Sequence, residues 1–232
     1  MNDEIWFEDL KKVKLKNATA IIGSPGLGSI GKLVVDNLIL ETKSKITTKL
    51  YSTHLPVFYQ SKPAYLAHYA LPGIAGTKIE EKITDLPKVD FYVSEPSLIL
   101  VNGYHSNFEG AFEIAEKVVE KLIDLGAKLI IITAGYGSKE KKVCCAATTL
   151  ELVKKMKTEY NIDTDYQGPF YGFSGLVFGA AKLKEVEAIS LFSGVEAQLG
   201  NPEFPAKESA EELTKILRKI IQVPKKTQSS LI

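Results

Sequence analysis

A glycine-rich stretch near the N-terminus holds the residues whose types and spacing best fit a chemical role. Residues 23–32 read GSPGLGSIGK. Gly26, Gly28 and Gly31 have the G-x-G-x-x-G spacing of a dinucleotide-binding turn. Gly26, Gly31 and Lys32 have the G-x-x-x-x-G-K spacing that opens a P-loop. Because amides at the start of a helix attract anions, these four residues form a candidate anion site.

Each nucleotide motif lacks a residue that its chemistry requires. A dinucleotide site needs an acidic residue about 20 positions after the glycines, where this chain has Thr53 and His54. A P-loop needs a magnesium-binding hydroxyl directly after its lysine, where this chain has Leu33. In the other interpretation the glycines serve the fold, because they let a helix pack tightly against a strand. We favour this interpretation and keep a nucleoside- or nucleotide-binding enzyme, with phosphate at Gly26–Lys32, as the alternative.

The remaining candidates for catalysis are isolated in the sequence. Cys144 and Cys145 are adjacent and precede two alanines, a pattern more typical of a small buried space than of a nucleophile. Ser174 lies in GFSG, one residue short of the G-x-S-x-G nucleophile motif. His105 follows a predicted strand, where ligands can bind, but a surface loop histidine is the favoured interpretation. We predict no catalytic residue, no metal site and no cofactor.

The hydrophobic pattern predicts the elements that position these residues. Apolar or alternating runs predict strands over residues 18–23, 45–52, 97–102, 127–133 and 187–193. Shorter strands are predicted over residues 56–60, 64–71 and 91–93. Helical spacing predicts helices over residues 29–41, 106–125, 148–160, 172–182 and from 205 to the proline at 224. Two capping boxes, Ser106 with Glu109 and Thr148 with Glu151, are predicted to open two of these helices.

The alternation of strands and helices predicts an α/β protein with a mostly parallel sheet covered by helices on both faces. The spacing indicates one domain over residues 1–224, with a possible β-rich excursion over 54–96. Residues 225–232 read KKTQSSLI and are predicted to form a flexible C-terminal tail.

Composition narrows the classes of partner. The net charge is +1 and 45% of the residues are hydrophobic, so neither nucleic acid nor a membrane is a predicted partner. Of the 29 basic residues only Arg218 is an arginine, whereas phosphate-handling sites favour arginine. The acidic N-terminus has no apolar segment of a signal peptide, and free cysteines are typical of a reducing compartment. We therefore expect a cytoplasmic protein.

Six segments in a fixed order are similar to one known family. They read GSPGLGSIGKL, LILVNG, LGAKLIIITAGYG, CCAATTLEL, GFSGLVFGAAKL and EAISLFSG. Together they resemble the archaeal branch of the proteasome assembly chaperone family (proteasome-assembly-chaperone-2-like proteins), over about residues 15–222. Each segment alone is a weak signal, whereas the order of the glycine loop, the TAGYG loop and the GFSGL helix is fairly specific.

This resemblance implies a fold and a function. It implies a three-layer α/β/α sandwich that is nucleoside-phosphorylase-like, and a non-enzymatic assembly factor or chaperone. It also implies that the chain binds proteasome α-subunits and associates with itself as a homo-oligomer or with a paralogue. Many family members end in a tail with the sequence hydrophobic-Tyr-any, which docks between neighbouring α-subunits through its terminal carboxylate. The matching, partner-binding positions here are Ser230, Leu231 and Ile232, with Ser in place of the hydrophobic residue and Leu in place of Tyr.

Overall fold

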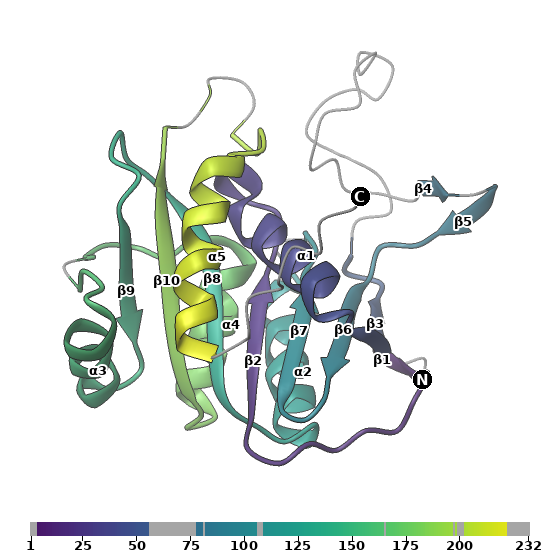
Figure 1. The fold of residues 1–232 in the computed structure, drawn as a ribbon. Helices are drawn as coiled ribbons and strands as arrows, with labels where there is room; N and C mark the ends of the chain where they lie inside the picture. Colours follow the sequence, from purple (N-terminus) through teal and green to yellow (C-terminus); the bar gives the residue numbers. More distant parts are fainter. Residues whose placement is uncertain are drawn as a thin grey trace, which may run out of the picture.

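A mixed eight-stranded sheet forms the centre of the molecule (Figure 1). The computed structural model describes residues 4–55, 78–80, 82–105, 109–164, 166–196, 198 and 202–221. The strand order is β1-β3-β6-β7-β2-β8-β10-β9. These strands are β1 (Ile5–Asp9), β2 (Ala18–Gly23), β3 (Lys45–Ser52), β6 (Val89–Ser94), β7 (Leu98–Asn102), β8 (Ala127–Gly137), β9 (Val143–Ala147) and β10 (Glu187–Val195).

The centre of this sheet is parallel and its edges are antiparallel. Strands β7, β2, β8 and β10 run in the same direction. On one side β6, β3 and β1 continue the sheet in alternating directions, and on the other side β9 is antiparallel to β10. The predicted parallel sheet is therefore confirmed for the four strands at its centre, which carry the glycine loop and the TAGYG segment.

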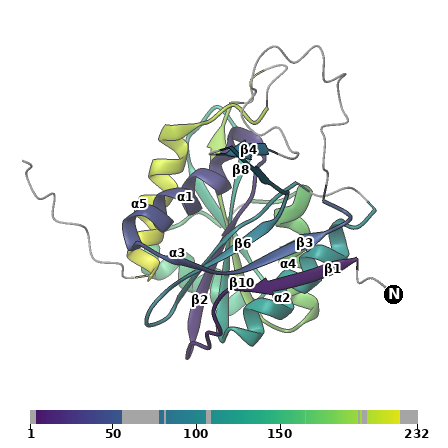
Figure 2. The ribbon, with the colours of Figure 1, turned by 90° about the vertical axis from the view of Figure 1, so that its right-hand side faces the viewer.

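Helices cover both faces of the sheet, so the three-layer α/β/α prediction is confirmed (Figure 2). The helices are α1 (Ile30–Thr42), α2 (Ala111–Asp124), α3 (Leu150–Tyr160), α4 (Gly172–Leu183) and α5 (Lys207–Ile221). Buried residues of α1, α3 and α5 share one hydrophobic cluster, and those of α2 and α4 share the other. Successive side chains of β2 point to opposite faces of the sheet and so pack in different helical layers. Ile21 packs with α1 and α5, whereas Ala20 and Ile22 pack with α2 and α4.

The two predicted capping boxes are wrong in position. Helix α2 begins at Ala111 after Gly110, without a side-chain cap. A Cβ on Gly110 would lie 2.0 Å from the His54 ring, so only glycine fits at this helix start. In α3 the cap is Thr149, whose hydroxyl accepts a 3.3 Å hydrogen bond from the Leu152 amide. The hydroxyl of Thr148 instead accepts a hydrogen bond from the amide of Ala188 in β10, which takes it away from the helix.

Sequence patterns did not identify the two edge strands. Strand β1 follows an acidic segment and lies at the edge of the described sheet beside β3. None of its residues is fully buried, and its sequence IWFED does not alternate between apolar and polar residues. Strand β9 contains the cysteine pair and borders β10. In the predicted excursion the structure places a separate hairpin, β4 (Lys78–Glu80) with β5 (Ile83–Asp85). The strands predicted over 56–60 and 64–71 and the tail over 225–232 lie outside the described residues.

Candidate functional site

Three segments that are far apart in the sequence meet around one cavity of about 520 Å³. They are the loop after β2, the end of β8 at residues 134–137, and the first turn of α4 with the segment before it. The cavity lies beyond the carboxyl ends of the parallel strands, which is where open α/β sheets bind ligands. It therefore brings together the glycine loop, the TAGYG segment and the GFSG segment of the sequence.

Two glycines bring α1 close to the sheet. A Cβ on Gly31 would lie 2.4 Å from the carbonyl oxygen of Thr133 in β8. A Cβ on Gly23 would lie 1.9 Å from the carbonyl oxygen of Gly31. The Thr133 hydroxyl donates a 3.1 Å hydrogen bond to the carbonyl of Ile22 and so links β8 to β2 beneath the helix. These contacts favour the interpretation in which the glycines serve packing.

The polar groups at the start of α1 contact another part of the chain. The amide of Gly28, which has a φ of +65°, donates a 2.8 Å hydrogen bond to the carbonyl of Pro202. The Ser29 hydroxyl donates a 2.8 Å hydrogen bond to the carbonyl of Glu203. The amide of Ala206 returns a 2.9 Å hydrogen bond to the carbonyl of Gly28. Backbone carbonyls before α5 thus accept hydrogen bonds where an anion would otherwise bind.

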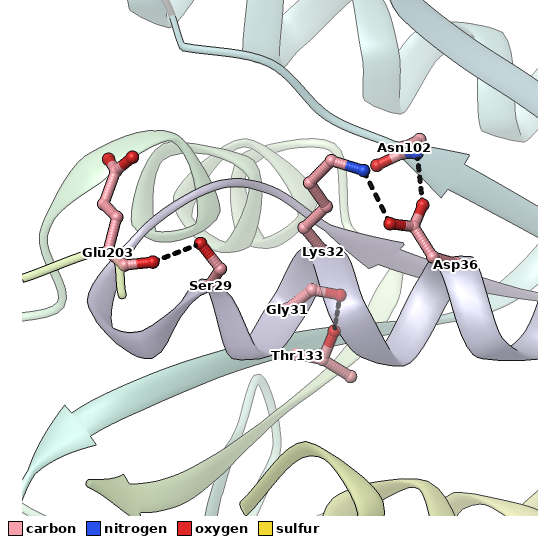
Figure 3. A network of polar contacts seen from close by, with 7 residues as sticks. All are labelled: Ser29, Gly31, Lys32, Asp36, Asn102, Thr133 and Glu203. Carbon is pink, nitrogen blue, oxygen red and sulfur yellow. Dashed lines mark hydrogen bonds and ion pairs between the residues drawn. The ribbon is translucent and has the colours of Figure 1, made fainter. Parts of the chain in front are cut away.

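Lys32 forms an ion pair with a neighbouring residue of its own helix, at a partly exposed position (Figure 3). Its Nζ lies 2.6 Å from Oδ2 of Asp36, one helical turn further along α1. The other oxygen of Asp36 accepts a 2.7 Å hydrogen bond from Nδ2 of Asn102 at the end of β7. Figure 3 shows these three side chains together on one side of α1. Anion binding by Gly26, Gly28, Gly31 and Lys32 stays a prediction, and it would require this pair to open.

The cavity wall is rich in aromatic rings. The ring of Phe192 in β10 stacks on the ring of Tyr166 with a centroid distance of 4.4 Å. The ring of Phe170 packs edge-on against Phe192 with a centroid distance of 4.7 Å. The same cavity is lined by Ser24 and Ser174, whose hydroxyls lie 3.0 Å apart in a hydrogen bond. The residues that line the cavity include no Asp, Glu, Lys, Arg or His in the described part of the chain. Sequence patterns did not identify the aromatic part of this site, because its aromatic residues belong to a loop and to the buried face of a strand.

The cysteines are poor nucleophiles in this structure. Cys144 and Cys145 lie in β9 with 5% and 1% of their surface exposed. Burial raises the pKa of the Cys145 thiol to about 11 and also raises the pKa of Cys144, so neither forms much thiolate at neutral pH. His105 lies with Nε2 at 3.4 Å from Oε2 of Glu203, the residue whose carbonyl accepts the hydrogen bond from Ser29.

A second polar feature lies at the end of β7. Asp90 of β6 is directly opposite Asn102 in the strand register. Oδ1 of Asp90 and Oδ1 of Asn102 are both buried without a hydrogen-bond partner among the described residues. Burial raises the pKa of Asp90 to about 6, against the opposing influence of nearby lysines such as Lys88. This carboxylate therefore costs stability when it is charged.

Two classes of site find no support within the described residues. No helix among them is both long and apolar enough to cross a membrane. No group of three or more His, Cys, Asp or Glu side chains in the same part of the chain could hold a metal ion. The predicted partner-binding residues Ser230, Leu231 and Ile232 lie outside these ranges.

A match to a protein-family model shows the family of this chain. The model described as PAC2 family matches residues 20–232. The chain belongs to the PAC2 family. The resemblance inferred from the six segments is thereby confirmed. A sequence relative is an uncharacterized protein of Methanocaldococcus jannaschii, 27% identical over 218 residues, which cover 89% of this chain and 78% of that protein.

Solved structures share the PAC2 fold over nearly the whole chain. Pyrococcus furiosus PbaB, described as an archaeal proteasome activator, matches with a TM-score of 0.77 and 23% identity over 95% of this chain and 90% of PbaB. Pyrococcus furiosus PbaA, described as an archaeal homologue of proteasome-assembly chaperone, matches with a TM-score of 0.72 and 19% identity over 95% of this chain and 87% of PbaA. At these identities the two matches establish the fold.

Proposed function

We propose that this PAC2 protein is a non-enzymatic assembly factor that binds proteasome α-subunits as a homo-oligomer. The observation that carries the proposal is the family membership over residues 20–232, together with the likeness to PbaB and PbaA over 95% of the chain. The geometry is consistent with it, because the cysteines are buried and the glycine-loop donors contact the chain's own carbonyls.

Several exposed apolar side chains are available for protein contacts. Tyr171, Leu40, Leu150 and Leu183 each expose about two thirds or more of their surface, with values of 81%, 73%, 73% and 67%. Aromatic residues such as Tyr171 are enriched at the centres of protein interfaces, and an exposed leucine gains hydrophobic free energy when a partner buries it. These positions are therefore the first to substitute when the surface that contacts α-subunits, or a second copy of the chain, is mapped.

Co-purification tests this proposal directly. The tagged full-length chain is mixed with recombinant proteasome α-subunits of the same organism, and the complex is isolated and weighed by native mass spectrometry. We expect a stoichiometric complex between an oligomer of the chain and α-subunits. An oligomer that shows no affinity for α-subunits at micromolar concentration would overturn the proposal.

A truncation then separates the tail from the folded body. Deletion of residues 225–232 is compared with a variant in which only Leu231 and Ile232 are changed to Ser. If the tail docks, both variants lose most of their affinity for α-subunits but keep the melting temperature of the parent protein. If both bind as tightly as the parent, the contact belongs to the folded body, and docking by Ser230, Leu231 and Ile232 is refuted.

A further inference from the structure

The aromatic cavity has the size and make-up of a small-molecule site. Its volume of about 520 Å³ falls in the range of about 300–1,000 Å³ that is usual for ligand pockets. Such pockets combine an apolar wall with a few polar groups that orient the ligand. Here the apolar wall is the group of rings around Phe192, and the polar groups are Ser24 and Ser174.

The two serine hydroxyls carry one proton that has no acceptor among the residues that the structure describes. Ser24 and Ser174 expose only 6% and 8% of their surface. The hydrogen bond between their hydroxyls, at 3.0 Å, consumes one of their two protons. The second proton needs an acceptor, because a buried donor without one costs about 1–3 kcal/mol. Both residues line the cavity, so an acceptor atom placed in the cavity can receive this proton.

The first turn of α4 favours an acceptor with negative charge. Gly172, Phe173 and Ser174 line the cavity at the N-terminal end of this 12-residue helix. No side chain caps the helix and no acidic residue occupies its first turn, in contrast to the Thr149 cap of α3. Partial positive charge at a helix N-terminus attracts anions. The cavity lining within the described residues contains no carboxylate that would repel one.

The aromatic part of the cavity lining suits a flat ring. Tyr166 and Phe170 are only half-buried although both pack against Phe192. The Tyr166 hydroxyl donates a 2.8 Å hydrogen bond to the carbonyl of Pro169, so the ring is held in place. Partly open rings in fixed positions favour stacked or edge-on contact with another aromatic ring.

We propose that this cavity binds a small carboxylic acid that carries a flat aromatic ring. The carboxylate accepts hydrogen bonds from the Ser24–Ser174 pair at the start of α4, and the ring packs against Tyr166 and Phe170. The proposal concerns a ligand and goes beyond the proposed function, since it requires neither α-subunits nor the tail.

Two glycines offer a way to fill the cavity without disturbing the fold. Gly26 and Gly137 both line it, and a Cβ on either would meet no atom within 4 Å. Gly26 has an extended φ of 171°, so a side chain causes no backbone strain there. Gly179, on α4 but outside the lining, also has nothing within 4 Å of its Cβ position and provides the matched control.

The test measures binding of indole-3-acetate to the full chain by ligand-observed NMR and isothermal titration calorimetry. Indole-3-acetamide, which lacks the charge, and acetate, which lacks the ring, are the comparison probes. We expect indole-3-acetate to bind at least about tenfold more tightly than either. We expect the Ser24→Ala/Ser174→Ala variant to bind it about tenfold more weakly, because a hydrogen bond to a charged group is lost. Gly26→Val and Gly137→Val should weaken binding similarly, whereas Gly179→Ala should not.

Thermal melts of every variant separate loss of binding from loss of folding. The two valine variants are expected to melt within about 3 °C of the parent, since their Cβ positions have no atom within 4 Å. The serine variant loses one buried hydrogen bond and is expected to melt about 2–6 °C lower but to remain folded. If one of them unfolds, the others still decide the outcome. The proposal is overturned if indole-3-acetate does not bind at millimolar concentration. Equal binding of the acetamide, or undiminished binding to the folded serine and valine variants, would overturn it as well.

Discussion

A Cβ on Gly31 would lie 2.4 Å from the carbonyl oxygen of Thr133. Gly31 belongs to the first turn of α1, and Thr133 belongs to β8, the strand beside β2 in the centre of the sheet. The helix therefore approaches the sheet more closely than any residue with a side chain allows. This contact explains the last glycine of both nucleotide-like motifs by packing, without a ligand.

Gly31→Ala is expected to destabilise the protein by about 2–3 kcal/mol, because the added methyl group meets backbone that cannot move aside. For a chain of this size the melting temperature should fall by about 4–12 °C, as measured by circular dichroism. Gly179→Ala serves as the control, since its Cβ position is open and alanine favours a helix interior. Equal melting temperatures for the two variants would contradict the packing role of Gly31.

Phosphate, ATP and NAD are expected to leave the melting temperature unchanged. The Gly28 amide and Ser29 hydroxyl already donate to Pro202 and Glu203, and Lys32 is paired with Asp36. A ligand at a hundredfold excess over its Kd would stabilise the fold by about 2.7 kcal/mol, which a thermal-shift assay detects easily. A shift that sodium chloride of equal ionic strength does not reproduce, and that Lys32→Met abolishes, would establish the nucleotide-binding alternative.

Asp90→Asn is expected to stabilise the protein at pH 7.5 and to have little effect at pH 4. Burial raises the folded-state pKa of Asp90 from 3.8 to about 6, so the folded state keeps a proton that the unfolded state loses between these values. The stability gained by keeping Asp90 protonated in the folded state is complete below about pH 4 and is lost as the pH rises through about 6. The difference amounts to about 2–3 kcal/mol at most.

Urea unfolding at several pH values checks the Asp90 prediction. The other charged groups that act on the pKa of Asp90 are three lysines, Lys88, Lys49 and Lys32, and one acid, Asp85. Because these residues remain in the variant, the difference between the parent and Asp90→Asn isolates Asp90. An asparagine at this position also offers an N–H group to the unpartnered Oδ1 of Asn102 across the strand pair. Parallel pH profiles for the two proteins would refute the predicted shift.

Arg218→Lys is expected to weaken the contact between α5 and α1. Arg218 donates from Nε to Oε2 of Glu41 at 3.0 Å and makes a second hydrogen bond to the other carboxylate oxygen. Lysine keeps the charge but loses this two-point geometry, at an expected cost of about 0.5–1 kcal/mol. Lys215→Met, which removes an exposed pair with Glu212 on the same helix, should leave the urea midpoint unchanged. Equal effects of both substitutions on the urea midpoint would show that the two-point contact of Arg218 with Glu41 does not stabilise the protein.

The main elements of the fold are encoded locally and were predictable. Strand β3 matches its predicted bounds of 45–52, and β2 matches 18–23. Buried strands in a parallel sheet are continuous apolar runs and amphipathic helices repeat at helical spacing, so both patterns are visible without tertiary information. The edge strand β1 was not visible, because its face is half exposed and its place depends on pairing with β3.

The candidate site was only partly predictable. The glycine loop and the GFSG segment could be singled out, because glycine spacing is read directly from the chain. The hydrogen-bond partner of each polar group could not be predicted from the sequence. Lys32 meets Asp36 within one helix, but Ser29 meets Glu203 across 174 positions of sequence and Ser24 meets Ser174 across 150.

The sequence by itself determined the α/β class, the segments that form the core and the family, because each depends on local patterns or on their order along the chain. Only the tertiary structure decided that Gly31 is a packing residue, that the start of α1 contacts carbonyls before α5, and that aromatic rings and two serines enclose a cavity. These outcomes depend on which distant segments the sheet brings into contact. A contact between distant residues leaves no periodic signal in the residues between them.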